Sequence, residues 1–238
     1  MFEYIEKIKI LIDKLASEQK EQLSLASQWV AEVISKDGII HTLGTGHSQM
    51  VGMELFGRAS SIANVNAIMD DMVLLTSGAR RSSEIEKISG IAGVLWNKYT
   101  FKQKDLFIII SNSGRNALPI EMAIKAKQKG LKVIAITSLT QSKKYKSRHD
   151  SGKNLFQIAD LIIDNCVPSG DGIMTSNGKL IGPSSSILGM LIVNCIASEA
   201  VKICSEKGID VPVFQSQNID ETNNDELYKK FESRILHF

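Results

Sequence analysis

A run of small polar residues, Ser111 to Asn116, offers the densest hydrogen-bonding chemistry in the chain. It carries hydroxyls at Ser111 and Ser113 and side-chain amides at Asn112 and Asn116. The run follows an apolar segment and precedes a stretch of helix formers, so its donors and the unpaired N–H groups of a helix start would converge on one anion. A plain helix cap needs only one such residue. The pattern therefore predicts a phosphate-binding turn.

A second polar turn, GTGHS, follows the apolar run Ile39–Leu43. Its Gly-x-Gly pair, with Asp70 further along, is also compatible with a dinucleotide site, but Gln49 stands where the third glycine of that fingerprint belongs. A dinucleotide oxidoreductase is therefore the least favoured interpretation. We expect Gly46 and Ser48 to line the same pocket as the first turn.

Three side chains are candidates for proton transfer. Glu54 lies two turns into the helix expected after Ser48, and a carboxylate partly removed from water there would act as a general base. His47 lies in the second polar turn and His149 in a basic loop. The alternatives stay open, because Glu54 and Arg58 at i, i+4 also form an ordinary surface ion pair and single histidines are often structural.

The elements that position these residues follow from the apolar pattern. Apolar segments separated by helical patterns predict a three-layer α/β/α fold with a five-stranded, parallel, doubly wound sheet. The strands are expected at 39–43, 62–69, 106–110, 131–137 and 161–164. Helices are expected at 2–36 (in one or two pieces), 49–59, 84–88, 91–99, 117–129, 184–207 and 225–235, and a hairpin at 173–181. Residues 1–38 then form an N-terminal helical extension, 39–208 the sheet domain and 209–238 a tail.

Composition narrows the classes of function. With 238 residues, 43% hydrophobic, 23% charged and a net charge of +2, the chain is typical of a globular protein and not of a nucleic-acid binder. The basic stretch Lys143–Lys153 lacks interleaved aromatic residues and is interpreted as a solvated loop. No cluster has convincing metal-ligand spacing, and no cofactor is expected.

Location is inferred from the cysteines and the apolar runs. The three cysteines are odd in number and lack CxxC spacing, which favours neither disulfides nor zinc and makes the cytoplasm the default. The longest apolar run, Ile187–Ala197, is shorter than the ~20 residues of a membrane span. We expect a core or interface helix there and no membrane. Together with the N-terminal helix, it offers surplus apolar surface that predicts a homodimer or a higher homo-oligomer.

The ordered motifs GTGHS, ISNSGRN, VIAITS, SRHDSGK and ADLIIDN resemble those of the sugar isomerase (SIS) domain, and most of all an uncharacterised bacterial group within it. Relatives in the superfamily include phosphoheptose isomerase and N-acetylmuramic acid 6-phosphate etherase. The resemblance spans nearly the whole chain. It implies that Ser111, Asn112, Ser113 and Ser48 grip a sugar phosphate, and that Asn116 stands where the family more often has a hydroxyl.

Two functions are consistent with this resemblance. The favoured one is an enzyme, an aldose–ketose isomerase or an etherase/lyase, acting on a sugar phosphate, with amino and N-acetylated sugars among the candidates. The alternative is a non-catalytic phosphosugar sensor. A sensor of this class predicts an attached DNA-binding module, and the N-terminal helix has no such pattern.

Overall fold

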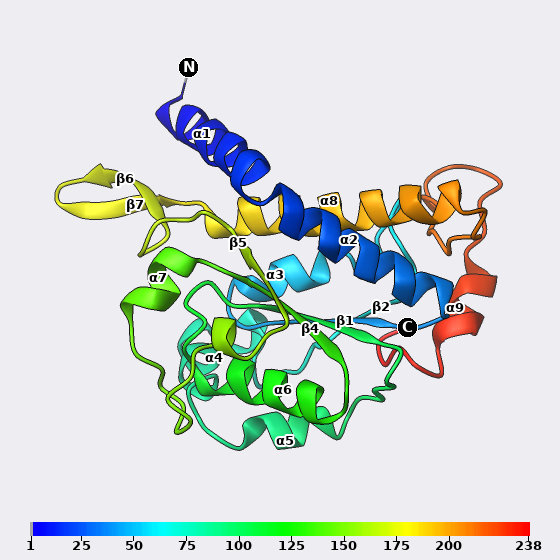
Figure 1. Ribbon diagram of the computed structural model, residues 1–238, viewed down its shortest axis with the longest axis horizontal. Coiled ribbons are helices and arrows are strands. Elements are labelled where there is room, and N and C mark those ends of the chain that lie inside the picture. The colour runs from blue at the N-terminus through cyan, green and yellow to red at the C-terminus, as the bar shows by residue number, and fades with distance from the viewer. Residues whose placement is uncertain (1) are drawn as a thin grey trace.

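The computed structural model describes residues 2–238 and shows three layers, with a parallel sheet between two layers of helices (Figure 1). The strands run in the order β2-β1-β3-β4-β5. They are β1 Ile40–Gly44, β2 Val65–Ala67, β3 Leu106–Ile110, β4 Lys132–Thr137 and β5 Leu161–Asp164. The predicted fold class is confirmed. Because the order reverses between β1 and β3, ligands are expected at the carboxyl ends of these two strands.

Strand β3 shows why the sheet forms. All five of its residues are buried, and its pairing with β1 sets Ile40 against Leu106 and Gly44 against Ile110. Alternate side chains serve opposite faces, so Ile108 enters one apolar core and Phe107 the other. A run of β-branched residues suits a strand covered on both sides.

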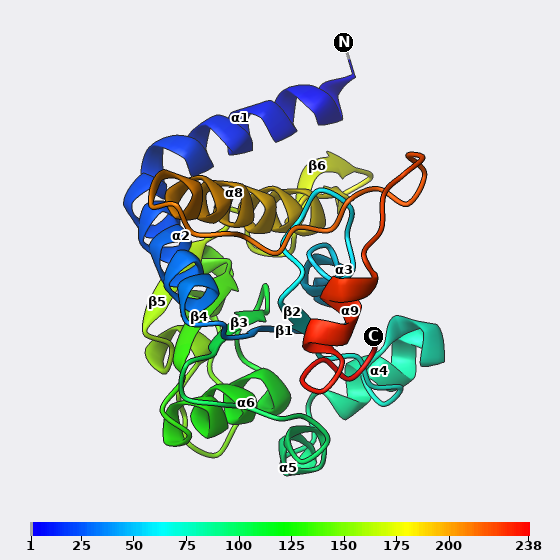
Figure 2. The same ribbon diagram turned by 90° about the vertical axis from the view of Figure 1, so that its right-hand side faces the viewer.

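One helical layer contains α2, α3 and α8, with α1 farther from the sheet (Figure 2). Their bounds are α1 Glu3–Glu18, α2 Lys20–Ser35, α3 Ser48–Met53 and α8 Ser185–Glu206. The N-terminal helical segment is thus in two pieces that meet at Gln19, whose side-chain oxygen accepts the N–H of Asp164 at 3.0 Å. Helix α2 packs between α8 and the sheet.

The opposite layer contains α4, α5 and α6, while α7 lies at the carboxyl edge of the sheet. The bounds are α4 Ala79–Ile85, α5 Ile91–Trp96, α6 Ala117–Gln128 and α7 Leu139–Lys144, with 3-10 turns at Leu75–Ser77 and Leu155–Gln157. Aromatic and branched side chains beneath α5 and α6 form the second core. This layer brings the start of α6 to the end of β3.

Two smaller units flank the three layers. The predicted hairpin consists of β6 Gly172–Ser176 and β7 Lys179–Pro183, and the Tyr4 hydroxyl ties it to α1 by donating to the Pro183 carbonyl. The C-terminal helix α9, Asp225–Phe231, packs over a small core that includes Phe214 and Ile235.

Several elements are shorter than predicted: the helices expected at 91–99 and 225–235 end at Trp96 and Phe231, and two other elements show the physical reason. The strand expected at 62–69 pairs in the sheet only over Val65–Ala67, because Ile62 bridges Val213 of the C-terminal segment instead. The helix expected at 49–59 stops at Met53, and Gly57 and Ser60 then take positive φ angles of 59° and 63°. Tertiary pairing and turn geometry override the local pattern in both places.

Within residues 2–238, α8 has the length and apolar composition of a membrane-spanning helix. In this fold, 44% of its most apolar window is buried, and it packs against α2 and α3. Core helices of globular proteins pass the same test.

Candidate functional site

The polar turns after β1 and β3 meet at the carboxyl edge of the sheet, and glycines make the close approach possible. A Cβ on Gly44 would lie 2.2 Å from the Ser48 carbonyl oxygen, so α3 can begin directly over the strand end only when this residue is glycine. Gly114 has a φ of 59°, and a Cβ there would lie 2.7 Å from the Ser142 hydroxyl. The β1 turn therefore depends on the absence of a side chain at Gly44, and the β3 turn also depends on a backbone conformation at Gly114 that other residues adopt poorly.

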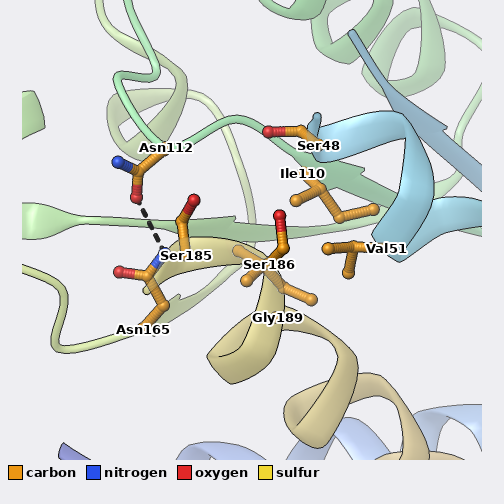
Figure 3. A pocket seen from close by; sticks show the side chains of 9 residues that line it. Ser48, Val51, Ile110, Asn112, Asn165, Ser185, Ser186 and Gly189 are labelled. Atoms are coloured by element: carbon orange, nitrogen blue, oxygen red, sulfur yellow. Dashed lines mark hydrogen bonds between the residues drawn. The ribbon is translucent and has the colours of Figure 1, made fainter. Parts of the chain in front are cut away.

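A narrow crevice separates the two turns from the start of α8 (Figure 3). Its polar wall consists of Ser48, Asn112, Asn165, Ser185 and Ser186. Val51, Ile110, Ile136 and Gly189 form its apolar wall. The amide of Asn165 donates to Asn112 Oδ1 at 2.9 Å across one side. The cavity volume is about 10 Å³, which is room for about one water molecule.

The start of α8 already holds an anion supplied by the chain. One oxygen of the Asp171 carboxylate accepts the N–H groups of Ser184 and Ser185 at 3.0 and 2.7 Å, and the other accepts the Ser185 hydroxyl at 2.8 Å. A carboxylate is well placed at the positive end of a helix dipole. Asp171 therefore caps α8 and fixes Ser185, one of the two α8 serines that face the crevice.

The turn after β3 carries hydrogen-bond donors that face no protein acceptor. Among residues 2–238, the backbone N–H groups of Asn112, Ser113 and Arg115 have no partner. The helix itself contributes less than the sequence suggested, since Leu118 N–H donates to the Glu86 carbonyl at 3.1 Å and Pro119 has no N–H. Backbone N–H groups of the turn, rather than those of the first helical turn, are thus the main donors available to an anion.

The structure brings together most of the predicted anion-binding residues. Ser48 and Asn112 line the crevice, Gly46 gives the β1 turn its positive φ of 55°, and Ser113 lies in the β3 turn with part of its surface accessible. The hydroxyl of Ser111 is buried and accepts Gly114 N–H at 3.2 Å, so it shapes the turn.

Asn116 is placed differently from the prediction. Its side-chain nitrogen donates to Glu86 Oε1 at 2.7 Å, and its oxygen accepts Arg148 Nη1 at 2.9 Å. Both ends of this amide are therefore engaged by other side chains rather than free to meet a phosphate.

The three predicted proton-transfer residues do not line the crevice. Glu54 is held by Arg58 Nε at 3.0 Å and by the amide of Asn194 on α8 at 2.9 Å. His47 is exposed at the start of α3. His149 lies 3.7 Å from Glu121 of α6, on a separate surface.

A carboxylate that the sequence analysis missed lies between the two turns. Glu86 accepts the Thr45 hydroxyl from the β1 turn and the Asn116 amide from the β3 turn. Burial raises the pKa of Glu86, although these two hydrogen bonds and the nearby Lys87 and Arg148 charges oppose that effect. No local motif marks this residue, since it follows a short helix in an unremarkable charged segment.

A second titratable cluster lies at the opposite, amino edge of the sheet. His41 Nε2 and Arg234 Nη2 contact Asp105 Oδ2 at 3.3 and 2.6 Å. The side chains of His41 and Asp105 are 0% exposed. Burial lowers the pKa of His41, whereas hydrogen bonds from His41 and the backbone outweigh burial at Asp105 and hold its pKa at about 2. Because both side chains are buried and Arg234 belongs to the C-terminal segment, the cluster has a structural role, anchoring that segment.

Within residues 2–238, no group of three His, Cys, Asp or Glu side chains is arranged to hold a metal ion. The crevice and its turns instead present hydroxyl and amide donors, which bind an oxyanion directly.

Comparisons with known proteins agree with this reading of the fold. The SIS domain family matches residues 3–138. A UPF0309 protein of Caldanaerobacter subterraneus subsp. tengcongensis is 40% identical over 241 residues, covering 98% of each chain.

Two solved structures share the fold. Phosphoheptose isomerase of Neisseria gonorrhoeae has a TM-score of 0.55 at 16% identity, over 84% of this chain and 95% of that one. Vibrio vulnificus NanR in complex with ManNAc-6P has a TM-score of 0.53 at 14% identity, over 86% of this chain and 63% of that one. The match to more than half of the chain, and the full-length similarity to the UPF0309 protein, show that this chain belongs to the SIS domain family.

Proposed function

We propose that this protein binds a sugar phosphate at the carboxyl edge of its sheet and catalyses a proton-transfer reaction on the sugar, an aldose–ketose isomerisation or an ether elimination. One observation carries the proposal: unpaired N–H groups of the β3 turn lie beside the hydroxyls of Ser113 and Ser48 where the strand order reverses. Such a set of fixed donors is what a phosphate monoester requires.

The small volume of the crevice limits where the ligand lies. A space of about 10 Å³ cannot hold a phosphate, so the phosphate sits at the mouth, where Ser48, Asn112 and Ser113 each keep accessible surface. The sugar then extends away from α8, whose start is already occupied by Asp171. The solved relatives support the ligand class, since one is a phosphoheptose isomerase and another binds ManNAc-6P.

Calorimetric titration against a panel of sugar phosphates tests the site. Replacing Ser113 with Ala removes one donor to a charged group and should weaken binding roughly 10- to 100-fold, which corresponds to about 1.5 to 3 kcal/mol. Ser198→Ala is the matched control, because Ser198 is an exposed serine on α8 outside the crevice. Equal losses in both variants would contradict the proposed site.

Solvent deuterium exchange separates the enzyme from the sensor. An enzyme that removes a proton beside a carbonyl exchanges it with D2O, and the same step begins both isomerisation and elimination. A sugar phosphate that binds tightly yet never takes up deuterium or turns over would favour the phosphosugar sensor. Glu54, His149 and His47 are the candidates proposed from sequence for this chemistry.

We further propose that the protein works in the cytoplasm as a homodimer. Helices α3 and α8 pack together beside the crevice and expose Met50, Met53 and Ile187 at 43%, 40% and 41%. A second copy of the chain covering this face would remove these side chains from water. The three free cysteines are compatible with a reducing compartment.

A further inference from the structure

Glu86 lies between the two polar turns, and the proposed function gives it no role. It follows α4 at the carboxyl edge of the sheet, and its two oxygens reach different polar turns. Oε2 accepts the Thr45 hydroxyl, three residues before Ser48, and Oε1 accepts the Asn116 amide at 2.7 Å, at the end of the β3 turn. One carboxylate therefore bridges the two segments on which the phosphate is expected to sit.

A cationic side chain supports this junction from a third segment. Arg148 Nη1 donates to Asn116 Oδ1 at 2.9 Å, and Arg148 N–H donates to the Arg115 carbonyl at 2.8 Å. Asn116 thus stands between Glu86 and the guanidinium and is held in one orientation from both ends. Supporting hydrogen bonds of this kind fix the position of a reacting group.

The surroundings of Glu86 suit proton transfer better than a simple structural tie. Burial raises the pKa of its carboxyl and so makes the carboxylate a stronger base, while Lys87 and Arg148 keep the ionised form accessible. Each carboxylate oxygen offers about two acceptor positions. Within residues 2–238, each accepts one side-chain hydrogen bond, which leaves a position on each oxygen for substrate.

We propose that Glu86 is a catalytic residue that moves a proton between adjacent carbons of the bound sugar phosphate. This inference rests on the proposed function. The carboxylate takes a proton from the carbon beside the carbonyl. The C–H electron pair becomes the C=C bond of an enediolate, the C=O π pair moves to the carbonyl oxygen, and that oxygen takes up the proton of the neighbouring hydroxyl. Glu86 then returns its proton to the former carbonyl carbon while the neighbouring oxygen forms the new C=O bond, so the sugar is isomerised with no other reactant.

The test begins with a sugar phosphate from the panel that the wild-type protein binds, followed by its deuterium uptake in D2O under saturation. Glu86→Gln keeps the shape and the hydrogen-bonding reach of the side chain but removes the base. We expect affinity within about 3-fold of wild type and exchange lowered by roughly 100- to 10,000-fold. Glu84→Gln is the matched control, since Glu84 lies on α4 two residues before Glu86, is exposed and pairs with Arg80 at 3.0 Å, and it should exchange at the wild-type rate.

Each outcome bears on the inference. Wild-type exchange in saturated Glu86→Gln would overturn it, and loss of exchange in Glu54→Gln alone would transfer the role to Glu54. If Glu86→Gln fails to fold or bind, Glu86→Asp retains a charged but shorter carboxylate. Exchange reduced at least 10-fold at unchanged affinity in that variant supports the inference, and an unchanged rate and pH profile overturns it.

Failure of the proposed function gives a different result. If no sugar phosphate binds, the proposed function fails and the inference fails with it. If a sugar phosphate binds to the wild type but shows neither exchange nor turnover, binding stands and the role of Glu86 is refuted.

Discussion

Replacing Asp105 with Asn should lower the stability of the fold strongly, because its buried carboxylate pairs with the Arg234 guanidinium and with the His41 imidazole. The side chain is 0% exposed, and Arg234 Nη2 contacts it at 2.6 Å with only 12% of its own side chain exposed. The pKa of Asp105 falls from 3.8 to about 2 in the folded chain. At about 1.4 kcal/mol per pKa unit, that difference corresponds to roughly 2 kcal/mol of stability at neutral pH.

The sign of the pH dependence follows from the lowered pKa. Between pH 3.8 and 2 the unfolded chain binds the proton more tightly than the folded chain, so the contribution of Asp105 is complete above pH 4 and disappears as the pH falls through 2. His41 acts in the same direction. Burial depresses its pKa below 6.5, so stability also declines as the pH falls below that value.

Urea unfolding at pH 7 and at lower pH measures this effect. We expect Asp105→Asn to lose at least about 2 kcal/mol at pH 7, with more from the guanidinium left unpaired, and the gap to wild type should narrow below pH 4. Asp37→Asn is the control. Asp37 also ties the C-terminal helix, to Lys230 at 3.1 Å, but its side chain is 63% exposed, so the loss should stay below about 1 kcal/mol. Equal losses in the two variants would refute the reasoning.

Three further predictions concern the site and its surroundings. Asp171→Ala removes the carboxylate that caps α8 and should cost about 1 to 2 kcal/mol in urea unfolding. Gly114→Ala should lower the thermal midpoint of unfolding and abolish ligand binding, because its Cβ would lie 2.7 Å from a neighbouring hydroxyl. Gly178→Ala, at a position that also has a positive φ but meets nothing within 4 Å, should lower the midpoint less. A larger loss in Gly178→Ala than in Gly114→Ala would contradict the geometry. Ile187→Lys should convert the proposed dimer into a monomer in light scattering. Ile219→Lys, at a position on the C-terminal segment that is 61% exposed, should leave the mass unchanged. A monomeric wild-type protein would refute the dimer.

The sequence was a good guide to elements whose pattern is strong locally. Leu106–Ile110 forms β3 with the bounds predicted, because an unbroken β-branched run between polar residues has few alternatives. Ser48 and Asn112 face one crevice as expected, since carboxyl ends of neighbouring parallel strands lie at one edge.

Other features depended on contacts that are distant in the chain. Asn116 could be recognised as polar, but its engagement by Glu86, 30 residues away, follows only from how the end of α4 meets the start of α6. The cap of α8 is likewise set by a distant residue, since Asp171 reaches the start of the helix from the loop before the hairpin. Side-chain partners of this kind are set by tertiary packing, which neither periodicity nor spacing encodes.

The central claim is that the turn after β3 holds the phosphate group of a sugar phosphate. Its most direct test is calorimetric comparison of one sugar from the panel, such as ManNAc-6P, with its dephosphorylated form, using inorganic phosphate as a competitor. The account predicts saturable binding of the phosphorylated sugar, displacement by phosphate, and affinity lower by at least 100-fold for the dephosphorylated sugar, which corresponds to about 2.7 kcal/mol or more. Equal affinity for the two forms, for every sugar that binds, would contradict it.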